Sequence, residues 1–148
     1  MPFRFALEAV FHLRKSLEHQ QELRLRTANQ QVLGARHLIE KLDERLRRME
    51  SERSRALHTG TTASELQFEH LCEEEMQGQR REMVAELSRL ERLRDQQQKV
   101  LQHARRERET FESLRDKQFA DYQRDAARRE QRQLDDLFLS RQAYLRRG

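Results

Sequence analysis

One stretch of the chain repeats apolar residues at alternating intervals of three and four, which is the pattern of a coiled coil. It runs over residues 25–56 and lapses at one charged position, Arg53. Such a repeat keeps a narrow apolar stripe facing a partner helix in a left-handed supercoil. The stripe consists of Leu25, Ala28, Val32, Ala35, Ile39, Leu42, Leu46, Met49, Arg53 and Ala56. Upstream, a slip of one position is predicted before Leu25, and the stripe then continues through Phe3, Leu7, Val10, Arg14, Leu17 and Gln21.

The only convincing turn follows this stretch, at residues 58–64, where Gly60 can adopt the left-handed conformation that closes a helix. Either Ser64 with Gln67, or Thr62 with Glu65, could cap the next helix. Beyond the turn, helical signals continue almost to the C-terminus. The predicted seam of this second helix is Met76, Met83, Leu87, Leu90, Leu101, Ala104 and Phe111, with polar interruptions at Arg80, Arg94, Gln97 and Arg108. A second apolar row, predicted to widen this stripe, is Leu93, Val100 and Leu114.

The composition limits the chain to a thin helical fold. One Pro and four Gly among 148 residues are too few breakers for a turn-rich β fold, and 38% charged residues argue against a thick core. We therefore predict an all-α antiparallel two-helix coiled-coil hairpin, with a longer second helix that overhangs at the C-terminus. It forms a single domain over residues 1–148, with helix one at about 3–57, the turn at about 58–64 and helix two at about 65–145. The predicted register places Leu46 near Met76, Val32 near Leu90, and Leu7 near Arg115.

The length difference leaves roughly 25 C-terminal residues without a partner inside the chain. Their apolar residues fall at helical spacing, and a lone helix would expose them to water. They are Leu134, Leu137, Phe138 and Leu145, with Arg141 among them and Tyr144 beside them. Exposed apolar stripes mark binding surfaces, so we favour a partner protein here. Burial against a second copy, as a weak self-association, and fraying are the alternatives.

Charge and cysteine content narrow the function classes. The net charge of +4 is spread along the chain, with acids between the basic residues, so nucleic acid is not an expected partner. The single cysteine, Cys72, cannot form an internal disulfide, which is typical of a reducing compartment such as the cytoplasm. No run approaches the roughly 18–20 apolar residues of a membrane span.

No catalytic, cofactor or metal site is predicted, and we do not expect an enzyme. The four glycines are isolated, so no phosphate-binding loop is present, and two paired helices offer no concave pocket. His70 and Glu74 could hold a metal only weakly and are interpreted as exposed helix residues. Cys72 is interpreted as a small residue near the turn, with a reactive thiol as the alternative.

Both ends of the chain carry motifs that are typical of one known family. At the N-terminus an aromatic-Arg-aromatic stretch leads into a Glu-Gln-rich helix, through Phe3, Arg4, Phe5, Leu7, Val10, Leu13, Arg14 and Glu18. The C-terminal third is similar at Ala104, Arg105, Phe111, Glu112, Leu114, Lys117, Tyr122, Glu130, Gln131, Leu134, Asp135 and Asp136. With these residues the chain resembles the flagellar export chaperone family FliJ, which commonly has Asp-Glu where this chain has Asp135 and Asp136.

The resemblance implies a non-enzymatic stalk protein of the flagellar type III export apparatus. It implies three kinds of partner: the ring of the export ATPase FliI, whose assembly the stalk promotes; the export gate protein FlhA; and the chaperones of export substrates. It also implies a cytoplasmic location, peripheral on the inner face of the cell membrane. The residues then expected at the ATPase are Phe3, Phe5, Leu7, Val10, Phe111, Leu114, Tyr122, Leu134, Asp135, Asp136, Leu137 and Phe138. Those expected at the gate are Phe68, Leu71, Cys72 and Met76.

Three other readings stay open. The chain could be the equivalent stalk of a virulence type III secretion system, with the same mechanism in a different machine. It could be a plain structural coiled coil that self-associates and has no effect on an ATPase. It could also be a basic helix on nucleic acid or an anionic membrane, which would bind in a strongly salt-dependent way.

Overall fold

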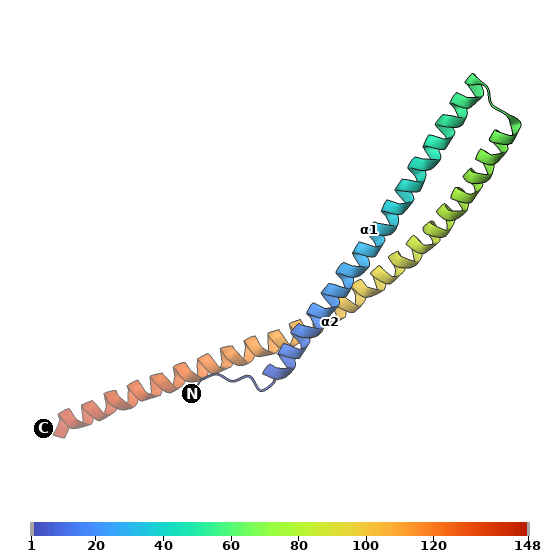
Figure 1. The fold of residues 1–148 in the computed structure, drawn as a ribbon. Helices are drawn as coiled ribbons and strands as arrows, with labels where there is room; N and C mark the ends of the chain where they lie inside the picture. Colours follow the sequence, from blue (N-terminus) through green and yellow to red (C-terminus); the bar gives the residue numbers. More distant parts are fainter. Residues whose placement is uncertain (1, 148) are drawn as a thin grey trace. The chain divides into compact units, whose positions relative to one another are not determined.

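A computed structural model describes residues 2–147, which form two long α-helices joined by a short turn (Figure 1). Helix α1 is Glu8–Thr59 and helix α2 is Ala63–Arg147, and no strand occurs within residues 2–147. The predicted all-α hairpin with a longer second helix is thereby confirmed. The contacts divide the chain into two units. One is Gln20–Gln102, which contains the turn, and the other joins Met1–His19 to His103–Gly148. The single domain over residues 1–148 stays a prediction.

The turn contains the predicted left-handed glycine, and one of the two candidate residues caps the second helix. Gly60 has a φ of 98°, a conformation that glycine adopts without a steric penalty, and its N–H donates to the carbonyl of Ala56 at 2.9 Å. Thr62 is the cap of α2, because its Oγ1 accepts the N–H of Glu65 at 3.2 Å. The Glu65 carboxylate also accepts the Thr61 hydroxyl at 2.8 Å.

The first helix begins later than the sequence predicts, at Glu8 instead of near residue 3. Residues 2–5 are not helical, and the Glu8 N–H donates to the carbonyl of Phe5 at 3.1 Å. In a helix, side chains two residues apart point to nearly opposite sides, whereas in extended chain they share a side. The extended start therefore lets both Phe3 and Phe5 turn toward α2, and Phe5 is buried with 6% of its surface exposed.

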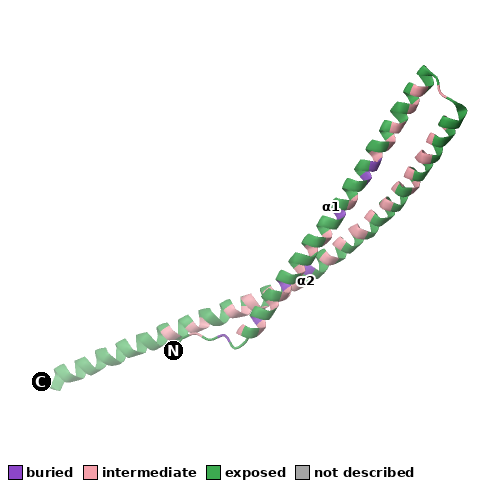
Figure 2. Cartoon of the chain, viewed as in Figure 1, coloured by how far each residue is buried: buried purple, intermediate pink, exposed green. Residues whose placement is uncertain are grey.

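Burial follows the predicted seams of both helices over most of their paired length (Figure 2). Every residue of the 25–56 stripe and of the predicted α2 seam is buried or half-buried. The second apolar row is less buried than the seams: Leu93 and Val100 are exposed, and only Leu114 is half-buried. Two helices alone cover a narrow strip of each other, so the neighbouring positions stay open to water.

The phase slip predicted before Leu25 is wrong. The deeply buried residues near the start of α1 are Phe11 and Glu18, while Val10 and Leu17 are only half-buried. The buried and half-buried positions 11, 14, 18, 21 and 25 keep intervals of three and four without interruption. A charged residue in an apolar seam disguised this continuity in the sequence.

Polar pairs across the two helices confirm the predicted antiparallel register. Within Gln20–Gln102, Arg80 Nε donates to Asp43 Oδ1 at 2.5 Å and Gln97 Nε2 donates to Gln21 Oε1 at 2.6 Å. In the other unit, the Arg115 guanidinium lies 3.4 Å from the Glu8 carboxylate, one residue from the predicted opposition of Leu7 and Arg115.

Candidate interaction site

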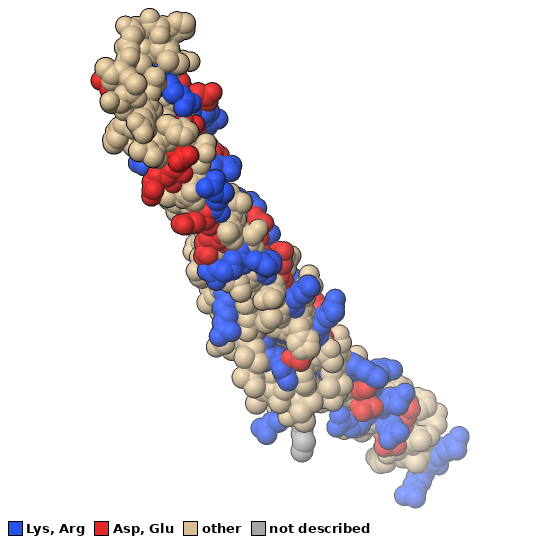
Figure 3. Space-filling view, turned by 90° about the vertical axis from the view of Figure 1, so that its right-hand side faces the viewer, with Lys and Arg blue, Asp and Glu red and all other residues tan. Residues whose placement is uncertain are grey.

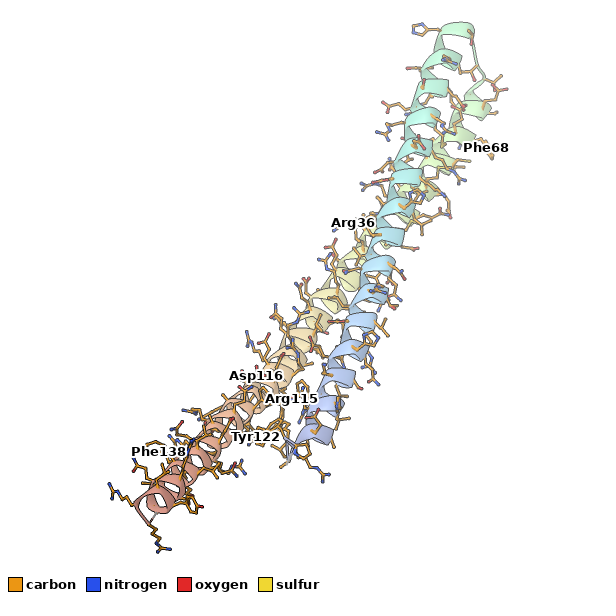
Figure 4. All side chains as sticks on the ribbon, turned by 90° about the vertical axis from the view of Figure 1, so that its left-hand side faces the viewer. Arg36, Phe68, Arg115, Asp116, Tyr122 and Phe138 are labelled. Atoms are coloured by element: carbon orange, nitrogen blue, oxygen red, sulfur yellow. The ribbon has the colours of Figure 1, made fainter. Side chains whose placement is uncertain are left out.

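An aromatic cluster closes the end of the helix pairing in the unit that contains both chain ends. The Phe3 ring packs edge-on against Phe119, with centroids 5.1 Å apart, and lies 5.5 Å from the Tyr122 ring. Tyr122 is labelled on α2 in Figure 4. Such pairs contribute about 0.5–1.5 kcal/mol beyond the area they bury. We call Phe3, Phe5, Phe119 and Tyr122 the aromatic clasp. It ties the non-helical N-terminal segment to α2.

Cations cover the aromatic rings of the next turns. The Arg115 guanidinium lies 5.3 Å from the Phe11 centroid, and Lys15 Nζ lies 5.2 Å from the same ring. The Arg14 guanidinium lies 5.9 Å from the Phe111 ring and also forms an ion pair with a glutamate of α2. The contacts of Arg115 with Phe11 and of Arg14 with Phe111 join the two helices and stabilise their pairing, whereas Lys15 contacts Phe11 within α1.

A buried carboxylate lies deeper in the same unit. Glu18 is 9% exposed and accepts two hydrogen bonds from Arg108, from Nε at 2.6 Å and from Nη2 at 3.3 Å. A third bond comes from Arg105 Nε at 3.4 Å, and Arg108 also donates to Glu112. The hydrogen bond from Arg108 is the main reason that the pKa of Glu18 lies below its usual value, while burial opposes the shift. In turn, Glu18 raises the pKa of Arg108.

Beyond the clasp, α2 continues without any covering segment. Every residue from 127 to 147 is exposed, and we call this stretch the overhang (Figure 2). Leu134, Leu137 and Phe138 expose 56%, 67% and 60% of their surfaces. Asp135 accepts a hydrogen bond from Gln131 Nε2 at 3.1 Å within the same helix. The predicted unpaired C-terminal end is thus present, as a helix with open apolar side chains.

The residues expected at the ATPase fall into two groups. Those near the N-terminus and the middle of α2 lie together in the paired part of the unit, and several serve its internal packing. They are Phe3, Phe5, Leu7, Val10, Phe111, Leu114 and Tyr122. Those of the overhang stand apart from them in the open: Leu134, Asp135, Asp136, Leu137 and Phe138.

Sequence reasoning missed several residues that shape this unit. Phe119 packs edge-on against Phe3, and its position three residues before Tyr122 indicates a shared helix face. Glu18 and Arg108 form the buried ion pair. In the sequence, this pair could be found only by noting that the intervals of three and four continue through the charged Glu18.

The residues expected at the export gate lie on α2 soon after the turn. Phe68, labelled in Figure 4, and Leu71 are exposed by 68% and 56%. Cys72 and Met76 are half-buried. Leu71 also lines a shallow hollow on α2, together with Glu74, Gly78 and other polar neighbours. Met76 belongs to the helix seam, so the surface available to a partner centres on Phe68 and Leu71.

Charged side chains of both signs are interspersed on the face drawn in Figure 3. Within residues 2–147, no three His, Cys, Asp or Glu side chains gather closely enough to hold a metal ion. Neither helix contains, in the same described range, a stretch long and apolar enough to cross a membrane.

The fold and its surfaces define a class of protein: a two-helix coiled coil whose longer helix presents an open end to other molecules. A family model described as "Flagellar FliJ protein" matches residues 3–148, so the chain belongs to the FliJ family. Membership makes it a flagellar export protein of the structural, chaperone type. No curated protein and no solved structure matches the chain.

Proposed function

We propose that this chain is the stalk of a flagellar export ATPase and catalyses no reaction itself. In this role the end formed by the clasp and the overhang binds the ring of FliI and promotes ring assembly. The region after the turn contacts the export gate protein FlhA, and the chain also meets the chaperones that deliver export substrates. It works in the cytoplasm, peripherally on the inner face of the cell membrane.

One observation carries this proposal: a FliJ-family chain leaves the last helical stretch of α2 unpaired, with its apolar side chains open. A helix with such a face binds a groove through residues spaced three and four apart. Burying Leu134, Leu137 and Phe138 against a partner would remove a large apolar area from water. The paired helices next to the overhang supply a stiff support, because Phe3 of the N-terminal segment packs against Phe119 and Tyr122 of α2.

Within this function, some residues stabilise the fold and others bind the partner. Phe5, Phe111 and Leu114 hold the paired helices, so their replacement should act on the fold first. Leu134, Leu137 and Phe138 face outward and should act on binding alone. Coupling to the ring then arises because the stalk binds some ring states more tightly than others.

The test adds the purified chain to the cognate export ATPase and follows the rate of ATP hydrolysis. We expect stimulation at about one chain per ring, with the overhang required for it. A triple replacement of Leu134, Leu137 and Phe138 by Ala should abolish stimulation and leave the helix content unchanged by circular dichroism. An active, assembly-competent ATPase that ignores the wild-type chain would contradict the proposal and favour a plain structural coiled coil.

The gate contact has its own test, with Phe68→Ala and Leu71→Ala in one chain. Both side chains are largely exposed, so the fold should persist. We expect weaker binding to FlhA and undiminished stimulation of the ATPase. Loss of both activities together would contradict the division into two surfaces.

A further inference from the structure

Leu134, Phe138 and Leu145 of the overhang do not continue the face by which α2 packs on α1, whereas Leu137 and Tyr144 lie within about 60° of that face. In the paired part of the same unit, that face carries half-buried residues such as Arg108, Arg115 and Tyr122. At 3.6 residues per turn, the positions that extend it into the overhang are polar. They are Arg129, Gln133, Asp136 and Ser140.

The main apolar stripe lies about 120° further round the helix at 3.6 residues per turn. Leu134, Phe138 and Leu145 fall within about 40° of one another, and Arg141 lies about 20° to one side of Leu134. All four are exposed. We call these four residues the overhang stripe. A helix that merely prolonged α1 would contact the polar positions that extend the packing face. The overhang stripe therefore suits a molecule that approaches from another side.

Arg141 specifies the chemistry of that molecule. Its guanidinium forms no ion pair with another described residue, although it lies within the apolar stripe. A partner that covers the stripe removes Arg141 from water, and burying an unpaired charge is strongly unfavourable. The partner surface must therefore provide an acceptor, and a carboxylate matches a guanidinium best.

We infer that the overhang docks through the overhang stripe into an apolar cleft of its partner that presents a carboxylate to Arg141. This inference rests on the proposed function, in which the ring of the export ATPase supplies the cleft. A second copy of the chain fits less well. Antiparallel pairing of Leu134 with the Phe138 of another copy sets Arg141 against Gln131, which cannot neutralise it.

The chain offers matched controls for each part of the stripe. Leu139 is 61% exposed, close to the 56% of Leu134, but it lies about 140° away around the same helix. Leu134→Ala and Leu139→Ala thus make the same chemical change on two faces. Likewise, Arg141→Gln and Arg132→Gln each remove one exposed charge, the first inside the stripe and the second outside it.

The experiment measures the dissociation constant of each full-length variant for the export ATPase. Leu134→Ala and Arg141→Gln should each weaken binding about tenfold, whereas Leu139→Ala and Arg132→Gln should change it less than about twofold. Arg141→Lys should restore part of the loss, because it keeps the charge without the bidentate geometry. Unchanged helix content by circular dichroism shows that each variant is folded.

Three failures are distinguishable. If the wild-type chain binds but Leu139→Ala or Arg132→Gln weakens it as much as its counterpart, the assigned face is wrong and the stalk function stands. If the wild-type chain neither binds nor stimulates the ATPase, the proposed function falls and the inference falls with it. If Arg141→Gln alone has no effect, the carboxylate in the cleft is wrong.

Discussion

The buried carboxylate of Glu18 allows the sharpest test of what holds the helices together. Glu18→Gln keeps the size of the side chain and one hydrogen-bond acceptor, but it removes the charge. A hydrogen bond to a charged group contributes about 1.5–3 kcal/mol and a neutral one about 1 kcal/mol. Arg108 retains its bond to Glu112, so no unpaired buried cation remains. The free energy of unfolding should therefore fall by about 1–2 kcal/mol.

The matched control is Glu91→Gln. Glu91 also pairs across the helices, with Arg36 Nη2 at 3.2 Å from its Oε1, but half of the Arg36 side chain is exposed. Exposed ion pairs contribute little, so this variant should change stability by less than about 0.5 kcal/mol. Thermal unfolding followed by circular dichroism compares the two, and the midpoint for Glu18→Gln should drop by about 4 °C. Equal effects of the two replacements would refute the assigned role of burial.

The pH dependence provides an independent check. The pKa of Glu18 is lowered in the folded chain, so its carboxylate stabilises the fold above its unfolded pKa of about 4.3. This contribution is lost as the pH falls through the lower folded pKa. The stability difference between wild type and Glu18→Gln should be full near about pH 7 and shrink progressively below about pH 4.3. A difference that stays constant across this range would show that the charge is not its cause.

Three further predictions concern the turn, the clasp and the interhelical ion pairs. Gly60→Ala should cost about 1–2 kcal/mol, seen in urea unfolding, because φ is 98° although nothing crowds an added Cβ. Phe3→Ala should cost about 2 kcal/mol and speed amide hydrogen exchange at the first turn of α1, with the overhang unaffected. Arg80→Gln should make stability less sensitive to added salt, measured by unfolding midpoints at low and high salt, because it removes the ion pair with Asp43.

The sequence was sufficient for the fold because one physical requirement dominates it. A chain with so few helix breakers and a repeat of 3.5 residues can bury apolar surface only along a second helix. The register followed from the position of the turn, and Asp43 with Arg80 and Gln21 with Gln97 lie opposite each other as that register requires. The unpaired end of α2 followed from the unequal lengths of the helices.

The errors have a common origin in reading residues one by one for apolar character. The spacing favours Leu17 as a seam residue because Glu18, one position away, is charged, yet Arg108 makes Glu18 acceptable in the seam. Val10 then follows from Leu17 at a distance of one heptad, although the buried residue is its neighbour Phe11. Likewise, Phe3 was placed in a helix because it lies a helical interval before Leu7. Contacts with α2, which local spacing does not encode, favour the extended start.

The sequence predicts that the overhang carries exposed apolar residues, but it does not tell which side of the helix they occupy relative to α1. The overhang apolar residues were recognised by their spacing, which says nothing about the direction of α1. That direction becomes known only when the burial of Tyr122 and its neighbours is seen, and it shows that the overhang stripe is rotated away from the helix seam. The gate-facing group stays a prediction, in which Met76 lies in the seam while Phe68 is exposed.

The polar positions in the seam explain how so repetitive a chain avoids pairing out of register. Apolar layers of Leu, Val and Ala would tolerate a shift of one heptad at little cost. With such a shift of α2 by seven residues, Glu18 would leave Arg108 for Leu101, and Asp43 would leave Arg80 for the acid Glu73. Each misplaced charge would lose its partner in a partly dry interface, which is more costly than a loosened apolar contact. Register specificity therefore resides in the charged layers. That register in turn determines which part of α2 lies opposite the start of α1. It therefore also determines how much of α2 remains unpaired and able to bind a partner.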